Sequence, residues 1–246
     1  MRIEGATALV TGGAKGLGLC IAMHLQELGA RVVVADLDDQ ALKALPESIS
    51  RHRCDITVQE QARGMVSAIG ASHGAIDILV NNAGLIYSEP FVNIMQPDAL
   101  MHDYERFRRC ITANLDSVFV MTSAVVEAMV LKRTKGAVVN VSSISARGNE
   151  GQTAYAAAKA GVEAMTVTWS KELGRLGIRC NAVAPGFIDT PSTRAALSEA
   201  NIKHVVSNTP LRRMGQATEV AKAVASLIDN DFLNGVVLDV NGGLAI

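Results

Sequence analysis

Two side chains that could exchange a proton, Tyr155 and Lys159, stand four residues apart in an alanine-rich stretch. Alanine favours a helix, and residues four apart in a helix lie on the same face. A tyrosine phenol has an ordinary pKa of about 10, and a neighbouring ammonium group favours its ionised form. Ser142, thirteen residues before Tyr155, ends an apolar run, where its hydroxyl could hold a substrate oxygen. Together the three residues predict proton exchange with an alcohol or a carbonyl, although each alone could be a surface or capping residue.

A glycine-rich turn follows the first apolar segment of the chain, A-L-V-T at positions 8–11. Gly12, Gly16 and Gly18 would let the backbone turn tightly and approach a pyrophosphate, while the N-terminus of the next helix offers free N–H groups. A strand, a glycine turn and a helix in this order predict a dinucleotide site. The alternative is a turn of the same shape that binds no ligand.

The adenosine end of such a dinucleotide would meet Asp36, eighteen residues after Gly18. An acidic residue at the end of the second strand hydrogen-bonds a ribose diol and repels the 2′-phosphate of NADP. Leu37 follows it in place of an arginine that could bind that phosphate, so the sequence predicts NAD rather than NADP. Lys15 is the counter-indication, because its ammonium group could reach a 2′-phosphate from the glycine turn.

The overall composition is that of a globular protein without a strong charge. The chain has 246 residues, with 23 Lys and Arg against 24 Asp and Glu, and 49% of its residues are hydrophobic. This balance gives no electrostatic reason to expect binding to nucleic acid or to an anionic membrane. The four cysteines and five histidines lack the spacing of zinc ligands, so we expect buried thiols and no metal site. We expect no signal peptide and no apolar run that could span a bilayer, and therefore a cytoplasmic protein.

Apolar segments alternate with longer segments of helical period, as is typical of repeated βαβ units. We expect one domain over residues 1–246, an α/β Rossmann fold with a doubly wound, seven-stranded parallel sheet and helices on both faces. The predicted strands are residues 6–11, 31–36, 51–55, 76–81, 136–142, 177–183 and 235–240. The predicted helices are residues 16–28, 58–72, 104–131, 153–176 and 218–229, the last capped by Thr218. Residues 85–103 and 187–210 fit neither pattern and are expected to be loops that cover the substrate.

The order and spacing of these motifs resemble the short-chain dehydrogenase/reductase family over residues 6–243. The matching motifs are T-G-x-x-x-G-x-G at positions 11–18, N-N-A-G at 81–84, Y-x-x-x-K at 155–159 and P-G at 185–186, together with Asp55, Asn114 and Ser142. The resemblance implies an NAD(H)-dependent oxidoreductase that interconverts a secondary alcohol and a ketone by direct hydride transfer.

The resemblance also implies which residues hold the cofactor and which act in catalysis. The implied cofactor contacts are Gly12, Lys15, Gly16, Leu17, Gly18, Asp36, Leu37, Asp55, Ile56, Asn81, Asn82, Ala83, Gly84, Tyr155, Lys159, Pro185, Gly186, Ile188 and Thr190. The implied catalytic residues are Asn114, Ser142, Tyr155 and Lys159. Tyr155 would be the acid in reduction and the base in oxidation, and Ser142 would polarise the substrate oxygen. Lys159 would bond the nicotinamide ribose and lower the pKa of Tyr155, and Asn114 would hold a water that links Lys159 to solvent.

The substrate is the least determined part of this prediction. The segments 148–161 and 183–190 are similar to those of β-ketoacyl-carrier-protein reductases, which favours a 3-hydroxyacyl or 3-oxoacyl compound. That group generally uses NADPH, however, and Asp36 points equally to NAD-dependent dehydrogenases of cyclic, aryl or steroid alcohols. The expected substrate contacts form a mainly apolar pocket, namely Ser142, Ile144, Gln152, Tyr155 and Phe187. An acidic carrier protein could dock on Lys132, Arg133, Lys135 and Arg175, which could equally be solvated charges.

The resemblance further implies a homotetramer or homodimer assembled through the predicted helices 104–131 and 153–176 and the C-terminal segment.

Two other classes of function stay open. One is a non-catalytic, dinucleotide-binding regulator built on the same fold. The other is an epimerase or dehydratase relative that uses NAD transiently, for which NADH would not accumulate in step with product.

Overall fold

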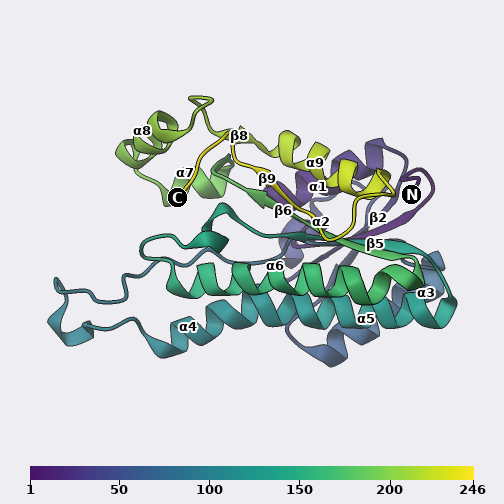
Figure 1. Cartoon of the computed structure of the whole chain (residues 1–246). Helices are drawn as coiled ribbons and strands as arrows, with labels where there is room; N and C mark the ends of the chain where they lie inside the picture. Colours follow the sequence, from purple (N-terminus) through teal and green to yellow (C-terminus); the bar gives the residue numbers. More distant parts are fainter.

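The computed structural model describes the backbone of residues 1–246 and every side chain except those of residues 97, 192 and 196. A seven-stranded parallel sheet with the order β3-β2-β1-β4-β5-β6-β9 lies at its centre (Figure 1). Its strands are β1 (Thr7–Thr11), β2 (Arg31–Asp36), β3 (Ser50–Arg53), β4 (Ile78–Asn81), β5 (Gly136–Val141), β6 (Ile178–Pro185) and β9 (Val237–Val240). Each of these strands overlaps one of the predicted strands. The predicted doubly wound parallel sheet is therefore confirmed.

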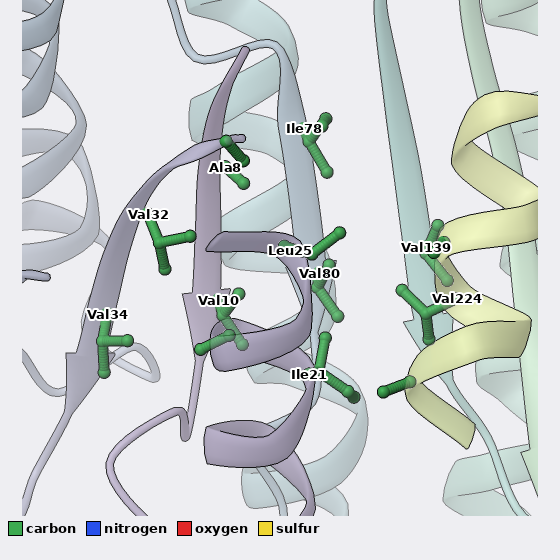
Figure 2. Close-up of a cluster of buried hydrophobic side chains, with 14 of the residues drawn as sticks. Ala8, Val10, Ile21, Leu25, Val32, Val34, Ile78, Val80, Val139 and Val224 are labelled. Atoms are coloured by element: carbon green, nitrogen blue, oxygen red, sulfur yellow. The ribbon is translucent and has the colours of Figure 1, made fainter. Parts of the chain in front are cut away.

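Helices cover both faces of the sheet, which is why its strands are apolar along their whole length. Helices α1 (Gly16–Glu27) and α9 (Ala217–Asp229) lie on one face, and α3 (Gln59–His73), α5 (Ser117–Lys132) and α6 (Thr153–Leu173) lie on the other (Figure 1). Alternate strand residues enter two separate cores. Figure 2 shows the first core, in which the strand residues Val10, Val34, Val80 and Val139 meet Ile21, Leu25 and Val224 from α1 and α9. The intervening residues Leu9, Val33, Leu79 and Val138 enter the second core with Ile69, Met121 and Met129.

One predicted helix has a widened turn in its middle. The helix predicted over 104–131 consists of α4 (Tyr104–Ile111), a π-turn η2 (Thr112–Asp116) and α5. Contrary to the sequence-based expectation, this stretch of 29 residues is long and apolar enough to cross a membrane by length and composition alone. Its residues Met121, Val125 and Met129 are, however, buried against the sheet, as expected for a core helix.

The second predicted loop contains regular structure, so that part of the prediction was wrong. It holds β7 (Ile188–Asp189), which pairs with β8 (Gly215–Gln216), and the helices α7 (Pro191–Ala196) and α8 (Glu199–Asn208). Thr190 and Ser198 cap these two helices by accepting backbone N–H groups. The first loop contains one 3-10 turn, η1 (Pro97–Ala99), and a single bridge between Val92 and Met101.

The remaining differences concern short helices and helix ends. The sequence patterns missed α2 (Asp39–Lys43), which Asp38 caps, and the 3-10 turns η3 (Ile144–Arg147) and η4 (Gly174–Leu176). Helix α9 is capped by Gln216 rather than Thr218. The Glu219 carboxylate accepts the Gln216 N–H at 2.8 Å, which is one half of a capping box.

Candidate active site

A cavity of about 860 Å³ opens at the carboxyl ends of β1 and β4, where the strand order of the sheet reverses. This is the place where open α/β sheets bind ligands. The predicted cofactor residues in its wall are Gly12, Lys15, Gly16, Leu17, Gly18, Asp36, Leu37, Asp55, Ile56, Asn82, Ala83 and Gly84. The wall residues that the sequence patterns missed are Ala14, Leu19, Ala35, Asp38, Cys54, Thr57, Leu85, Ala113 and Pro191.

The glycine turn has the geometry of a phosphate cradle. A Cβ atom added at Gly18 would lie 2.2 Å from the Gly12 carbonyl oxygen, so only glycine lets α1 approach the turn this closely. The Asn82 amide donates to the Thr11 and Gly12 carbonyl oxygens at 3.1 Å each and ties the ends of β1 and β4 together. Lys15 occupies the N-cap of α1, and a lysine side chain cannot accept a hydrogen bond. The first backbone N–H groups of α1 are therefore not capped by a side chain and stay available to an anion. The residues present therefore fit a dinucleotide.

Asp36 is held in a fixed position at the end of β2. Its two carboxylate oxygens accept the backbone N–H groups of Ala14 and Asp38, both at 3.1 Å. The carboxylate is thus tied to the glycine turn, and it lines the cavity. Next to it, the Lys15 ammonium group pairs with Asp38 at 2.5 Å.

Asn81 does not belong to this cavity, contrary to the sequence-based expectation. The side chain is buried, and its amide donates to the Thr122 hydroxyl at 2.9 Å and to the side-chain oxygen of Asn140 at 2.8 Å. Because side chains alternate along a strand, the first Asn of the N-N-A-G motif braces the sheet while the second faces the glycine turn.

Tyr155 and Lys159 lie on α6, as predicted, and both are buried. The Lys159 ammonium group is 5.6 Å from the centre of the Tyr155 ring and donates to the Val141 carbonyl oxygen at 2.8 Å. Burial raises the pKa of Tyr155 to about 12, an effect that a hydrogen bond with Ser143 partly opposes. Burial also lowers the pKa of Lys159 to about 8. Burial is thus the largest influence on the pKa of both groups, and it acts in opposite directions on the two. The lowering of the Tyr155 pKa by Lys159 beside a bound nicotinamide stays a prediction.

The structure places Ser142 differently from the sequence-based prediction. Its hydroxyl donates to the Glu163 carboxylate at 2.7 Å and to the Lys159 carbonyl oxygen at 3.4 Å, both within α6. The next residue, Ser143, is the one whose side chain hydrogen-bonds to Tyr155. Ser143 also caps η3 by accepting the Ser145 N–H at 3.1 Å. The serine beside the phenol is therefore Ser143, and Ser142 anchors the end of β5.

Asn114 occupies the π-turn and is fully buried. Its side-chain nitrogen donates to the Leu85 and Cys110 carbonyl oxygens at 2.9 Å each, and its side-chain oxygen accepts the Leu85 N–H at 3.2 Å. These bonds fix the start of the 85–103 segment. A Cβ atom added at Gly84 would lie 2.4 Å from the Asn114 side-chain oxygen and 3.7 Å from the Lys159 nitrogen, so the structure brings these residues together.

The other predicted residues lie outside the wall of the cavity. Pro185 ends β6, and the Gly186 N–H bonds the Val240 carbonyl oxygen at 3.0 Å. Ile188 is buried in β7, and Thr190 caps α7. Ile144 is buried, Phe187 is half-buried, and the Gln152 amide donates to the Ser88 hydroxyl at 3.1 Å. Among the described residues, no group of three or more His, Cys, Asp or Glu side chains is arranged to bind a metal.

Comparisons with known proteins identify the family. A family model described as enoyl-(acyl carrier protein) reductase matches residues 12–245. The chain is 38% identical to the 3-oxoacyl-[acyl-carrier-protein] reductase FabG of Thermotoga maritima, and the alignment covers 100% of each chain. The chain belongs to the short-chain dehydrogenase/reductase family. It is therefore an oxidoreductase that acts on CH–OH or ketone groups with a nicotinamide dinucleotide.

Further relatives of this short-chain dehydrogenase/reductase agree with that assignment. It is 35% identical to the FabG protein of Escherichia coli, with 99% of each chain covered. It is 34% identical to a (3R)-3-hydroxyacyl-CoA dehydrogenase of Canis lupus familiaris, with 99% of this chain and 98% of the relative covered. The crystal structure of gox2181 superposes with a TM-score of 0.88 at 32% identity and covers 98% of this chain and 96% of its own.

Proposed function

We propose that this enzyme interconverts a 3-oxoacyl and a 3-hydroxyacyl thioester, with NAD(H) as the cofactor. The observation that carries the proposal is the group formed by the buried Tyr155 and Lys159 and the half-buried Ser143, close to a cavity that fits a dinucleotide. The substrate class is supported by the relatives, which are named for 3-oxoacyl and 3-hydroxyacyl compounds. A phenol beside a serine hydroxyl suits the oxygen of a ketone, which must gain a proton when it is reduced.

In the reduction, Tyr155 donates its proton to the carbonyl oxygen, and the Ser143 hydroxyl donates a hydrogen bond to the same oxygen. The phenol is protonated near neutral pH, as a proton donor requires, because its pKa lies well above 7. A bound nicotinamide supplies or accepts the hydride. Lys159, whose ammonium group lies 5.6 Å from the centre of the Tyr155 ring, would hold the nicotinamide ribose. Asn114 is a positioning residue, whose side chain holds the backbone of Leu85 in place.

We assign the two ends of the dinucleotide to different parts of the sheet edge. Asp36, Leu37, Asp55 and Ile56, which line the cavity, would hold the adenosine end, and Gly16, Leu17 and Gly18 would hold the pyrophosphate. Lys159, Pro185, Gly186, Ile188 and Thr190 would hold the nicotinamide end. The fixed Asp36 carboxylate supports NAD, because it offers two oxygens to a ribose diol and opposes a 2′-phosphate. Ile144, Gln152 and Phe187 stay as proposed substrate contacts.

The test is oxidation of NADH and of NADPH with a panel of 3-oxoacyl thioesters and cyclic, aryl and steroid ketones. We expect turnover of the thioesters with NADH and a lower kcat/KM with NADPH. Turnover of only the other ketones would contradict the acyl substrate, and a higher kcat/KM with NADPH would contradict the cofactor preference. Tight binding of NADH without turnover of any substrate would favour the regulator.

We also propose that the enzyme is a homotetramer or homodimer that assembles through α5 and α6. These helices lie side by side at the surface of the molecule (Figure 1), and Phe119, Val130 and Leu131 of α5 are exposed. Apolar side chains gathered on one helix are typical of a surface that another subunit covers. We expect a mass of two or four chains of 25.9 kDa in light scattering, whereas a monomer at micromolar concentration would contradict the proposal. A single domain over residues 1–246 and a cytoplasmic location stay predictions.

A further inference from the structure

Lys15 and Asp38 form an ion pair within the wall of the cavity. The Lys15 nitrogen and an Asp38 carboxylate oxygen are 2.5 Å apart, and both residues line the cavity beside Asp36. The other Asp38 oxygen accepts the Ala41 N–H at 3.0 Å, as the cap of α2. Asp38 is thus held by the helix that it caps, and it in turn holds Lys15.

The Lys15–Asp38 pair determines which charges would surround the 2′-phosphate of a bound NADP. Lys15 is the basic residue of the glycine turn, and its side chain is 69% exposed, so its ammonium group could turn toward a ligand. In the structure it turns to Asp38, a partner that raises the pKa of Lys15 through a hydrogen bond and charge attraction. A phosphate monoester carries about −1.5 to −2 charges at pH 7. At this place it would face the carboxylates of Asp36 and Asp38, while the ammonium group of Lys15 is already paired with Asp38.

We propose that Asp38 is a specificity-determining residue, which disfavours NADP by withholding Lys15 from the 2′-phosphate and by adding a second carboxylate next to Asp36. Discrimination against NADP then depends on two acidic residues, Asp36 and Asp38, which act in different ways. Asp36 accepts the ribose diol, and Asp38 neutralises the one basic side chain of the glycine turn. This inference rests on the proposed preference for NAD.

The test is the binding of NADH and NADPH to the full chain, measured by titration calorimetry without substrate. Asp38→Asn removes the charge but keeps a good helix cap, since Asn caps helices about as well as Asp. We expect the Kd for NADPH to fall about tenfold, as for one new charge-assisted hydrogen bond to phosphate, while the Kd for NADH changes little. In a Lys15→Gln background, the same Asp38→Asn change should lower the Kd for NADPH by less than about threefold.

Asp39→Asn is the matched control, because it removes the same charge one position away. Asp39 pairs with Lys43 at 2.6 Å and is not among the residues that line the cavity. The ratio of the two Kd values should be unchanged in this variant. Equal gains in NADPH binding from Asp38→Asn and Asp39→Asn would overturn the inference, as would an equal gain from Asp38→Asn with and without Lys15.

The wild-type protein separates this inference from the proposed function. If the wild type binds NADH tightly and Asp38→Asn leaves the preference unchanged, only the inference fails. If the wild type binds NADPH more tightly than NADH, the NAD preference fails and the inference fails with it, because Lys15 is then not withheld. The melting temperature of each ligand-free variant should match that of the wild type within about 2 °C, which shows that the fold is kept.

Discussion

Turnover is expected to fall by about 10²–10⁴-fold when Tyr155 is replaced by Phe, the range for loss of a general acid. The phenol is the only group that we assign to deliver a proton to the substrate oxygen, and with a pKa of about 12 in the buried site it is protonated at neutral pH. The aromatic ring stays in the variant, so the packing around α6 is preserved. The rate is measured as NADH oxidation with a 3-oxoacyl thioester, and NADH binding by calorimetry.

The decisive feature of this prediction is that turnover falls while cofactor binding does not. The Kd for NADH should stay within about threefold of the wild type, because the ring and Lys159 both remain. Tyr104→Phe is the matched control, since Tyr104 is 68% exposed on α4 and loses the same hydroxyl. A Tyr155→Phe enzyme that retains more than about a tenth of the wild-type rate would show that another group delivers the proton.

Local sequence patterns predicted those parts of the molecule that local interactions determine. The glycine turn, the helix that follows it and Asp36 form one continuous βαβ unit, so their spacing along the chain fixes their arrangement. Likewise, Tyr155 and Lys159 share one helical face whatever surrounds them. The seven strands were predicted because a parallel sheet buried on both faces needs continuous apolar runs.

Adjacent residues at the end of a strand were harder to assign. Ser142 and Ser143 have the same side chain, as do Asn81 and Asn82, but neighbouring positions in a strand face opposite ways. Only the packed partners decide which one faces the site, and for Ser142 the partner is Glu163, twenty-one residues later on α6. The Lys15–Asp38 pair likewise joins two segments that are far apart along the chain. The short helices α7 and α8 were missed, although Thr190 followed by Pro191 is a recognisable start of a helix.

The pKa values follow from tertiary structure rather than from residue types. From spacing alone, an ammonium group four residues away suggests a lowered pKa for Tyr155. In the folded chain both groups are buried, and loss of solvent raises the pKa of the phenol and lowers that of the ammonium group. Tyr155 packs against Cys110 and Phe107 of α4 and against Tyr87 of the 85–103 segment, and the sequence did not reveal the course of that segment.

Ser143→Ala is expected to lower kcat by about 10²–10³-fold, as for the loss of one hydrogen-bond donor to a developing oxyanion. Ser142→Ala removes the same atom one residue earlier and serves as the matched control. This change breaks the bond to Glu163 and should cost about 1 kcal/mol of stability, seen as a lower melting temperature, with kcat within about fivefold of the wild type. Ser143→Thr keeps a hydroxyl and the η3 cap, so it should restore most of the activity.

These three variants decide which serine acts at the substrate. Ser143 also caps η3, so its loss could act through local structure rather than through the substrate oxygen. Loss of the cap alone would lower the melting temperature and leave kcat nearly unchanged, whereas loss of an oxyanion donor lowers kcat with NADH binding intact. A large fall in kcat for Ser142→Ala and a small one for Ser143→Ala would return the catalytic role to Ser142. It would also require the Ser142 hydroxyl to leave Glu163 when the substrate binds.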